Sequence, residues 1–232
     1  MKAEQVKSEL KKMADRKRAA VSHRFFKTGP GEYGHGDLFL GVTVPDQRKI
    51  ARKFTKLKYP EIEKLLLSSW HEHRLTGLLI LIDQYEKADL ADRKNIFNFY
   101  CRHLDSVNNW DLVDVSAPRI MGDYLINQER KILYKLAGSK NLWHRRISIV
   151  ATLAFIRNHD FRDTLKITRM LLKDDQDLIH KAAGWMLREV GKRDLLTAKE
   201  FIDQYHSEMP RTMLRYSLER FSAEERKYYL KR

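Results

Sequence analysis

Cysteine is almost absent from this 232-residue chain, and proline and glycine are scarce. The single cysteine, Cys101, excludes a disulfide framework and a cysteine-based zinc site, and it favours an intracellular, cytoplasmic protein. Five prolines and ten glycines suit a helical chain. No apolar run is long enough to span a membrane, and residues 1–21 are charged throughout, so the sequence predicts neither a membrane span nor a secretory signal.

Acidic residues are also in deficit. The chain has 31 aspartates and glutamates against 45 lysines and arginines, which leaves a formal net charge of +14. Such a surplus indicates a polyanionic partner, most simply nucleic acid, because phosphate neutralisation releases counterions. Anionic lipid or plain solvation would also suit a basic surface. The apolar content of 43% is enough for a hydrophobic core.

Apolar residues recur at helical spacing along most of the chain. Residues 2–24 predict one basic amphipathic helix, and no strand-like alternation or linker follows. We therefore expect an all-α chain with a single domain over residues 1–232. From residue 45 onward the predicted helices are 45–56, 60–68, 70–85, 88–104, 110–127, 128–137, 142–157, 160–173, 177–192, 195–206 and 210–220.

A weak internal repeat organises these helices. Trp70, Trp110 and Trp143 mark three helix starts at intervals of 40 and 33 residues, and a fourth helix at Asp177 follows the same plan. This period is typical of helix-pair solenoids and predicts a right-handed α-solenoid of HEAT-like pairs. The residues one turn into each helix should line one concave, mainly basic surface: Arg74, Asp114, Arg146 and Lys181.

The helix that begins at Trp110 carries the most informative stretch. Asn109 is a good N-cap, because its side-chain oxygen can accept a free backbone N–H of the first turn. Trp110 and Asp114 are four residues apart and should share a face. Pro118 lacks an N–H for the carbonyl of Asp114, so the helix should bend there. The stretch also fits a half-buried tryptophan with a solvated aspartate.

Two arginines stand near the start of the next tryptophan-marked helix. Arg145 and Arg146 suit bidentate binding of phosphate or carboxylate. One of them could instead pair with Asp111 or Asp114 and so join adjacent repeats. The sequence leaves both possibilities open.

The helix at 177–192 combines a stripe and a glycine. Lys181, Trp185 and Arg188 share a face with charge for phosphate and an apolar plate for a sugar or base. Taken alone, this stripe is better explained as an ordinary core tryptophan between solvated cations. Gly184 in mid-helix costs about 1 kcal/mol relative to alanine. A close neighbouring backbone or a ligand would justify it.

Two tempting motifs are excluded. Gly29, Gly31 and Gly34 match G-x-G-x-x-G, but the match follows a helix and contains Pro30, so it is not a dinucleotide site. A flexible loop near a phosphate backbone remains possible there. The two histidines of the 71–73 segment point in opposite directions on a helix and cannot share an ion, so we expect no metal.

The chain resembles the AlkD-type family of HEAT-like-repeat alkylpurine DNA glycosylases over about residues 20–220. The resemblance implies excision of 3-methyladenine and 7-methylguanine from duplex DNA, with no metal, no cofactor and no base flipping, by a monomer. The motifs that carry the resemblance are Asn109-Trp110-Asp111-Leu112-Val113-Asp114, Trp143-His144-Arg145-Arg146 and His180-Lys181-Ala182-Ala183-Gly184-Trp185-Met186-Leu187-Arg188-Glu189.

By position, the resemblance implies a role for each site residue. Asp114 matches the catalytic carboxylate. Trp110 and Trp185 match the indoles that flank the deoxyribose of the damaged nucleotide. Arg146 matches a basic residue that contacts the DNA backbone beside these indoles. Leu178 and Ile179 stand where aromatic residues are expected. Further DNA contacts are expected from Thr43, Arg48, Arg74, Arg145, Lys181 and Arg188.

The residue types agree with that chemistry. A 3- or 7-alkylpurine is cationic and leaves without an acid, so the protein needs mainly a carboxylate to stabilise an oxocarbenium-like sugar and to orient water. Two other classes stay open: a non-catalytic HEAT-repeat protein that binds damaged or branched DNA, and a protein scaffold.

Overall fold

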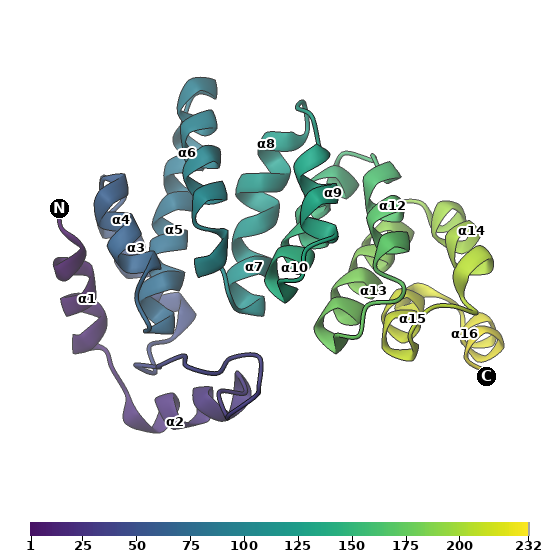
Figure 1. Cartoon of the computed structure of the whole chain (residues 1–232), viewed down its shortest axis with the longest axis horizontal. Coiled ribbons are helices and arrows are strands. Elements are labelled where there is room, and N and C mark those ends of the chain that lie inside the picture. The colour runs from purple at the N-terminus through teal and green to yellow at the C-terminus, as the bar shows by residue number, and fades with distance from the viewer. Residues whose placement is uncertain (232) are drawn as a thin grey trace. The chain divides into compact units, whose positions relative to one another are not determined.

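The computed structural model describes residues 1–231, and Arg232 lies outside this range (Figure 1). The described backbone forms helices and turns without a strand, and its only β-bridge is an isolated one between Leu38 and Trp70. The predicted all-α class is therefore confirmed. Within residues 1–231, no helix combines the length and the apolar character that a membrane crossing requires.

The chain divides into two compact units, Met1–Leu112 and Val113–Arg232. The division falls inside helix α7 (Trp110–Ser116), which agrees with the absence of a linker in the sequence. A single domain over residues 1–232 stays a prediction. The right-handed twist of the solenoid and its concave basic face also stay predictions.

The N-terminal unit is built around α5, whose residues Leu78–Ile82 are almost completely buried. Helices α1, α3, α4 and α6 pack against α5. Consecutive helices such as α4 and α5 pair as expected for HEAT-like repeats. The helices of this unit are α1 (Ala3–Lys12), α2 (Arg16–Phe25), α3 (Val44–Lys53), α4 (Tyr59–Leu66), α5 (His71–Lys87), α6 (Leu90–Arg102) and the 3₁₀ turn η1 (Leu104–Ser106).

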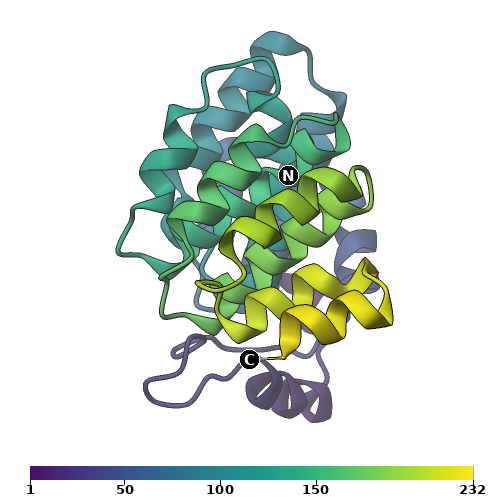
Figure 2. The ribbon, with the colours of Figure 1, turned by 90° about the vertical axis from the view of Figure 1, so that its right-hand side faces the viewer.

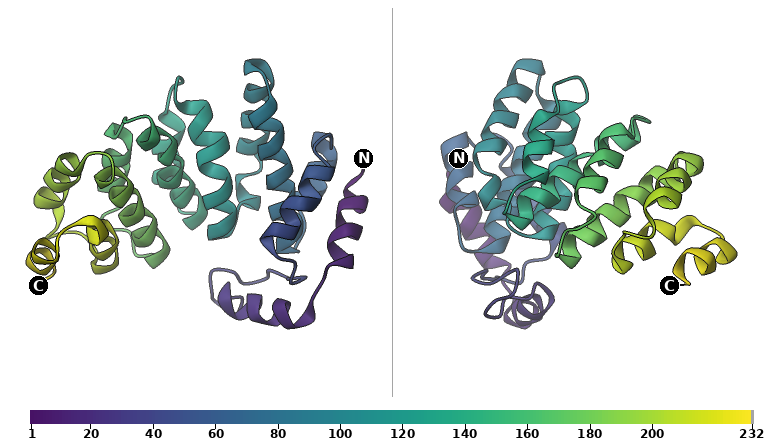
Figure 3. Two further views of the ribbon diagram at one scale, coloured as in Figure 1. Left: turned by 180° about the vertical axis from the view of Figure 1, so that it is seen from behind. Right: turned by 45° about the vertical axis from the view of Figure 1, so that its right-hand side comes forward.

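The prediction of one helix over residues 2–24 is wrong. The chain breaks after α1, and Asp15 caps α2 by accepting the Arg18 backbone N–H at 3.0 Å. Helix α1 buries Ala3, Val6 and Leu10, whereas α2 buries no residue. The apolar stripe is thus coherent only in its first half. Helix α2 lies at one end of the unit, apart from the α3–α5 bundle (Figure 3).

The C-terminal unit is built around α13, which packs against α10, α12, α14 and α15 (Figure 2). Its consecutive helices α9 and α10 also pair. The helices of this unit are α8 (Asp123–Leu125), α9 (Lys131–Ala137), α10 (Leu142–Ala151), α11 (Leu153–Arg157), α12 (Arg162–Met170), α13 (Asp177–Gly191), α14 (Leu195–Tyr205), α15 (Arg211–Ser217), α16 (Ala223–Leu230), the π-helix η2 (Ala117–Gly122) and the 3₁₀ turn η3 (Leu218–Arg220).

Two local expectations hold in this unit. The helical run after Trp110 changes from α to π geometry at residues 117–122, where Pro118 leaves a carbonyl without its usual donor. At Gly184, a Cβ would lie 2.5 Å from the carbonyl oxygen of Met213 on α15 and 2.6 Å from Cβ of Tyr216. The glycine therefore allows the close approach of α15 to α13, as its position in mid-helix suggested.

Candidate functional site

The carboxylate of Asp114 on α7 forms a bidentate ion pair with Arg146 on α10. Nε of Arg146 donates to one carboxylate oxygen at 3.0 Å, and an Nη donates to the other at 2.8 Å. The second Nη of Arg146 donates to the backbone oxygen of Leu178 at 2.5 Å. One guanidinium thus ties α7 to the start of α13. This fork geometry fixes both the position and the orientation of the carboxylate.

The two side chains of this pair differ in burial: that of Arg146 is buried, whereas that of Asp114 is partly exposed. The side chain of Arg146 is 6% exposed, whereas that of Asp114 is 22% exposed. A buried guanidinium with three hydrogen bonds inside the protein is poorly placed to hold a phosphate. The contact of Arg146 with the DNA backbone stays a prediction, and in this geometry its three hydrogen bonds hold Asp114 and the start of α13.

The neighbouring Arg145 selects a different partner. Its Nε donates to the carboxylate of Asp174 at 2.5 Å, and an Nη donates to the other oxygen at 3.2 Å. Asp174 is only 5% exposed. The sequence left open which arginine pairs with which aspartate. In the structure, Arg146 pairs with Asp114. It places Arg145 in a second pair, with Asp174, whose side chain is more deeply buried than that of Asp114.

Trp185 lies half-buried on α13, the same helix whose first turn binds Arg146. Its indole N–H donates to Glu189 at 3.2 Å. Glu189 also pairs with Lys192 at 2.6 Å and Arg193 at 3.4 Å. Burial alone would raise the pKa of Glu189, but hydrogen bonds from Lys192 and Trp185 hold it below its usual value. The indole is thus anchored by an ionised carboxylate one turn further on.

The remaining cations of the predicted stripe are engaged with acids. Lys181 pairs with Asp177 at 2.8 Å and keeps 41% of its side chain exposed. Arg188 pairs with Glu219 on η3. Both pairs are partly exposed, so water and a phosphate could compete for these cations. Their contact with DNA stays a prediction.

A buried charged cluster lies in the N-terminal unit, where the sequence suggested a DNA contact at Arg74. Arg74 is 4% exposed and pairs with Asp37 at 2.6 Å. His71 bridges Asp37 at 3.2 Å and Asp111 at 2.8 Å. Burial opposes charge on His71, but the Asp111 and Asp37 carboxylates overcome it and raise its pKa to about 9. Arg74 belongs to this internal network, and its contact with DNA stays a prediction.

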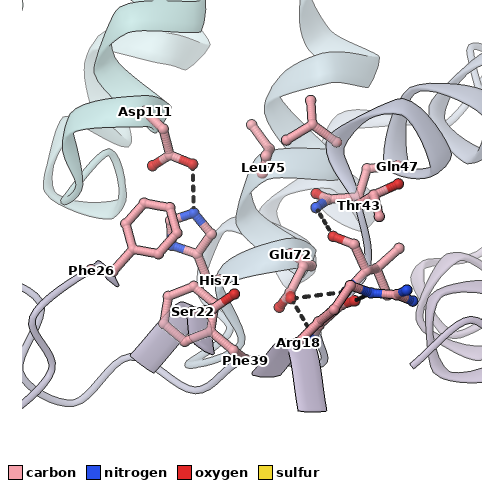
Figure 4. Close-up of a pocket in the computed structure, with 13 residues that line it drawn as sticks. Arg18, Ser22, Phe26, Phe39, Thr43, Gln47, His71, Glu72, Leu75 and Asp111 are labelled. Atoms are coloured by element: carbon pink, nitrogen blue, oxygen red, sulfur yellow. Dashed lines mark hydrogen bonds and ion pairs between the residues drawn. The ribbon is translucent and has the colours of Figure 1, made fainter. Parts of the chain in front are cut away.

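Glu72 organises the loop that precedes α3. Its buried carboxylate accepts backbone N–H groups of Leu40, Gly41 and Val42 at 2.8–3.3 Å (Figure 4). A cavity of about 200 Å³ lies beside it, lined by Arg18, Phe26, Phe39, Thr43, Gln47 and Asp111 among others. Thr43 caps α3 by accepting the Asp46 N–H, and Arg48 is half-buried on the same helix. Their DNA contacts stay predictions.

The family model for DNA alkylation repair enzymes matches residues 6–221, which is nearly the whole chain. The chain belongs to this family. Family membership supports a role in the repair of alkylation damage, with DNA as the substrate.

A solved structure supports the fold of this repair protein. The chain is similar to the structure described as "Predicted DNA alkylation repair enzyme from Enterococcus faecalis", with a TM-score of 0.73 and 16% sequence identity. The match covers 91% of this chain and 98% of that one. No curated protein matches significantly.

Aromatic packing around Trp110 is the part of this repair protein that sequence reasoning missed. Asn109 caps the helix as expected, accepting the Trp110 N–H at 2.8 Å. Phe26 stacks on the indole at 5.4 Å between ring centroids, and Phe25 meets it edge-on at 5.8 Å. Both come from the end of α2, more than eighty residues earlier. The adjacent aromatic pair was the only available signal.

Metal ligands do not gather in the described part of the chain. Residues 1–231 hold no group of three or more histidine, cysteine, aspartate or glutamate side chains suited to an ion. Burial raises the pKa of the Cys101 thiol to about 12.

Proposed function

We propose that this protein is a monofunctional DNA glycosylase that hydrolyses the N-glycosidic bond of cationic alkylated purines, chiefly 3-methyladenine and 7-methylguanine, in duplex DNA. It would act as a cytoplasmic monomer without a cofactor and begin base excision repair. The observation that carries the proposal is the carboxylate of Asp114, which is partly exposed and held in a fixed orientation by Arg146.

The reaction needs little more than such a carboxylate. The C1′–N9 bond breaks, and its electron pair neutralises the positive purine, so the leaving base requires no proton. The sugar becomes an oxocarbenium-like cation, which a nearby carboxylate stabilises. Water then forms the new C1′–O bond and loses one proton. Asp114 is the group that would face this sugar and orient the water.

The tryptophans fit the same chemistry. The face of an indole attracts a cation by about 0.5–2 kcal/mol. Trp185 is held by Glu189 in the C-terminal unit, and Trp110 begins the helix that carries Asp114. We infer that both indoles flank the sugar. Groups that act at the sugar do not require the base to leave the stack, in contrast to enzymes that act on a flipped base.

Base release from duplex DNA that contains 7-methylguanine tests the proposal. In Asp114→Asn, the shape is kept but the negative charge is lost, so excision should fall by about 100-fold or more. Affinity for the duplex should stay within about twofold, because the residue does not bind phosphate. Asp174→Asn is the matched control, since it also removes a carboxylate from a bidentate arginine pair. Excision by Asp114→Asn at the parental rate would refute the mechanism.

One observation favours a second candidate, a non-catalytic protein that binds damaged or branched DNA. The Asp114–Arg146 pair has the same bidentate form as the Arg145–Asp174 pair, which is buried and structural. A protein of this kind would bind alkylated or branched duplexes but release no base, and Asp114→Asn would bind as the parent does. The parental excision rate distinguishes the two candidates.

A further inference from the structure

Helix α2 exposes a face that is both basic and apolar. None of its residues is buried, and its sequence RKRAAVSHRF contains no acid. Val21 is 56% exposed and Phe25 is 62% exposed. Lys17, Val21, Arg24 and Phe25 follow helical spacing and share one side, which we call the α2 face. A partner that binds this face would cover its apolar side chains and neutralise its positive charge.

The α2 face is held in place by the loop before α3. The Asp15 N–H donates to the Leu40 oxygen at 2.8 Å, and Nε of Arg18 donates to the Gly41 oxygen at 2.7 Å. Gly41 has a positive φ of 79°, and a Cβ there would collide with the backbone of Asp15. The helix is therefore docked through its N-cap and Arg18, neither of which belongs to the α2 face.

The α2 face ends at Trp110. Phe25 meets this indole edge-on at 5.8 Å, and the next residue, Phe26, stacks on it at 5.4 Å. A ligand that covers Phe25 would therefore lie beside one of the indoles that we propose for the damaged nucleotide. Trp110 is therefore the residue that adjoins the α2 face.

We propose that the α2 face is a second DNA contact, which binds the sugar–phosphate backbone beside the damaged nucleotide. Lys17 and Arg24 neutralise phosphates, and Val21 and Phe25 cover apolar sugar edges. We choose DNA as the ligand because its negative charge complements that of the helix. Five of the ten residues of α2 are arginine, lysine or histidine, and none is acidic. The inference rests on the proposed function in taking DNA as the ligand and Trp110 as a residue beside the damaged nucleotide.

The salt dependence of binding to an undamaged duplex tests the basic half of the face. Each phosphate contact contributes about 0.9 to the slope of log K against log salt, so Lys17→Ala/Arg24→Ala should lower this slope by about 1–2. Lys56→Ala/Lys58→Ala is the matched control, because both lysines are exposed in the same unit, just beyond the far end of α3. Its slope should change by less than half as much. Equal losses in both variants, or no loss in either, would overturn the proposal.

Phe25→Ala tests the apolar half. Affinity for the duplex should fall by about fivefold or more, as when an aromatic contact to nucleic acid is removed. Leu90→Ala is the control, since Leu90 is 85% exposed on α6 and should leave affinity unchanged. Circular dichroism of each variant checks that the helices remain. Unchanged affinity in folded Phe25→Ala would contradict the apolar contact.

Anionic lipid is the competing ligand for a basic, apolar helix. Co-sedimentation with phosphatidylglycerol vesicles, with phosphatidylcholine vesicles as control, separates the two. Vesicle binding that is lost in the α2 variants, together with unchanged DNA binding, would assign the face to a membrane surface and overturn the proposal. These binding assays need no excision, so they can succeed even if Asp114 proves not to be catalytic.

Discussion

Two arginine–aspartate pairs, one in each unit, differ in how deeply the carboxylate is buried. Asp37 and Arg74 are 6% and 4% exposed, and His71 and Asn109 also bind the carboxylate. Asp114 forms as good a pair with Arg146 but keeps 22% of its side chain exposed. The first carboxylate is enclosed by donors of its own protein. The second presents a fixed negative charge at the surface, which is what a cationic sugar requires.

The largest expected difference is in stability. Asp37→Asn should lower the free energy of unfolding by about 3–5 kcal/mol, because it leaves the buried guanidinium of Arg74 without its counter-charge and removes one of the two carboxylates that bind His71. The same change at Asp114 should cost less, because the Asp114 side chain is 22% exposed to water, although it also leaves the buried Arg146 without its counter-charge. Urea unfolding of both variants measures this. Similar costs at the two positions would remove the distinction drawn here.

The pH dependence of stability should come mainly from the N-terminal cluster. The pKa of His71 is about 9 in the folded protein, above its ordinary value of 6.5, so folding favours the charged ring. Its contribution is complete below about pH 6.5 and is lost as the pH rises through 9, by roughly 3 kcal/mol. Unfolding free energies between pH 6 and 10 measure the loss, and His71→Gln should flatten the curve. A decline of the same size in that variant would exclude His71 as its source.

The smallest effect is expected from Arg146→Lys. Lysine keeps the positive charge but cannot make the bidentate fork, so Asp114 would be paired and less well oriented. We expect excision to fall about tenfold, with kcat affected more than KM, and duplex affinity to stay unchanged. A loss of affinity instead would mean that Arg146 binds phosphate directly, as the sequence had suggested.

Features that a few neighbouring residues determine could be predicted from the sequence. The cap at Asn109, the irregular helix after Pro118 and the close approach at Gly184 all follow from local rules. The break at Asp15 could not be predicted, because the apolar pattern continues weakly past it. Whether a new helix begins at Asp15 depends on contacts with the loop before α3, a segment that lies further along the chain.

The partners of charged side chains were the least predictable part of the candidate site. Arg74 had the spacing of a surface cation, yet Asp37 draws it into the interior from a different segment. Arg145 and Arg146 are adjacent in sequence but bind different aspartates on different elements. Such choices depend on tertiary contacts that no repeat period specifies. The resemblance to a family was needed to select Asp114 among the acids.

The carboxylate of Glu72 has a further consequence. By gathering the amides of residues 40–42, it orders the segment that positions α2 before any ligand arrives. Ordering one residue of backbone costs about 1–2 kcal/mol of conformational entropy, and here that cost falls on folding rather than on association. If α2 binds DNA as proposed, the segment that positions it would not have to be ordered again on binding.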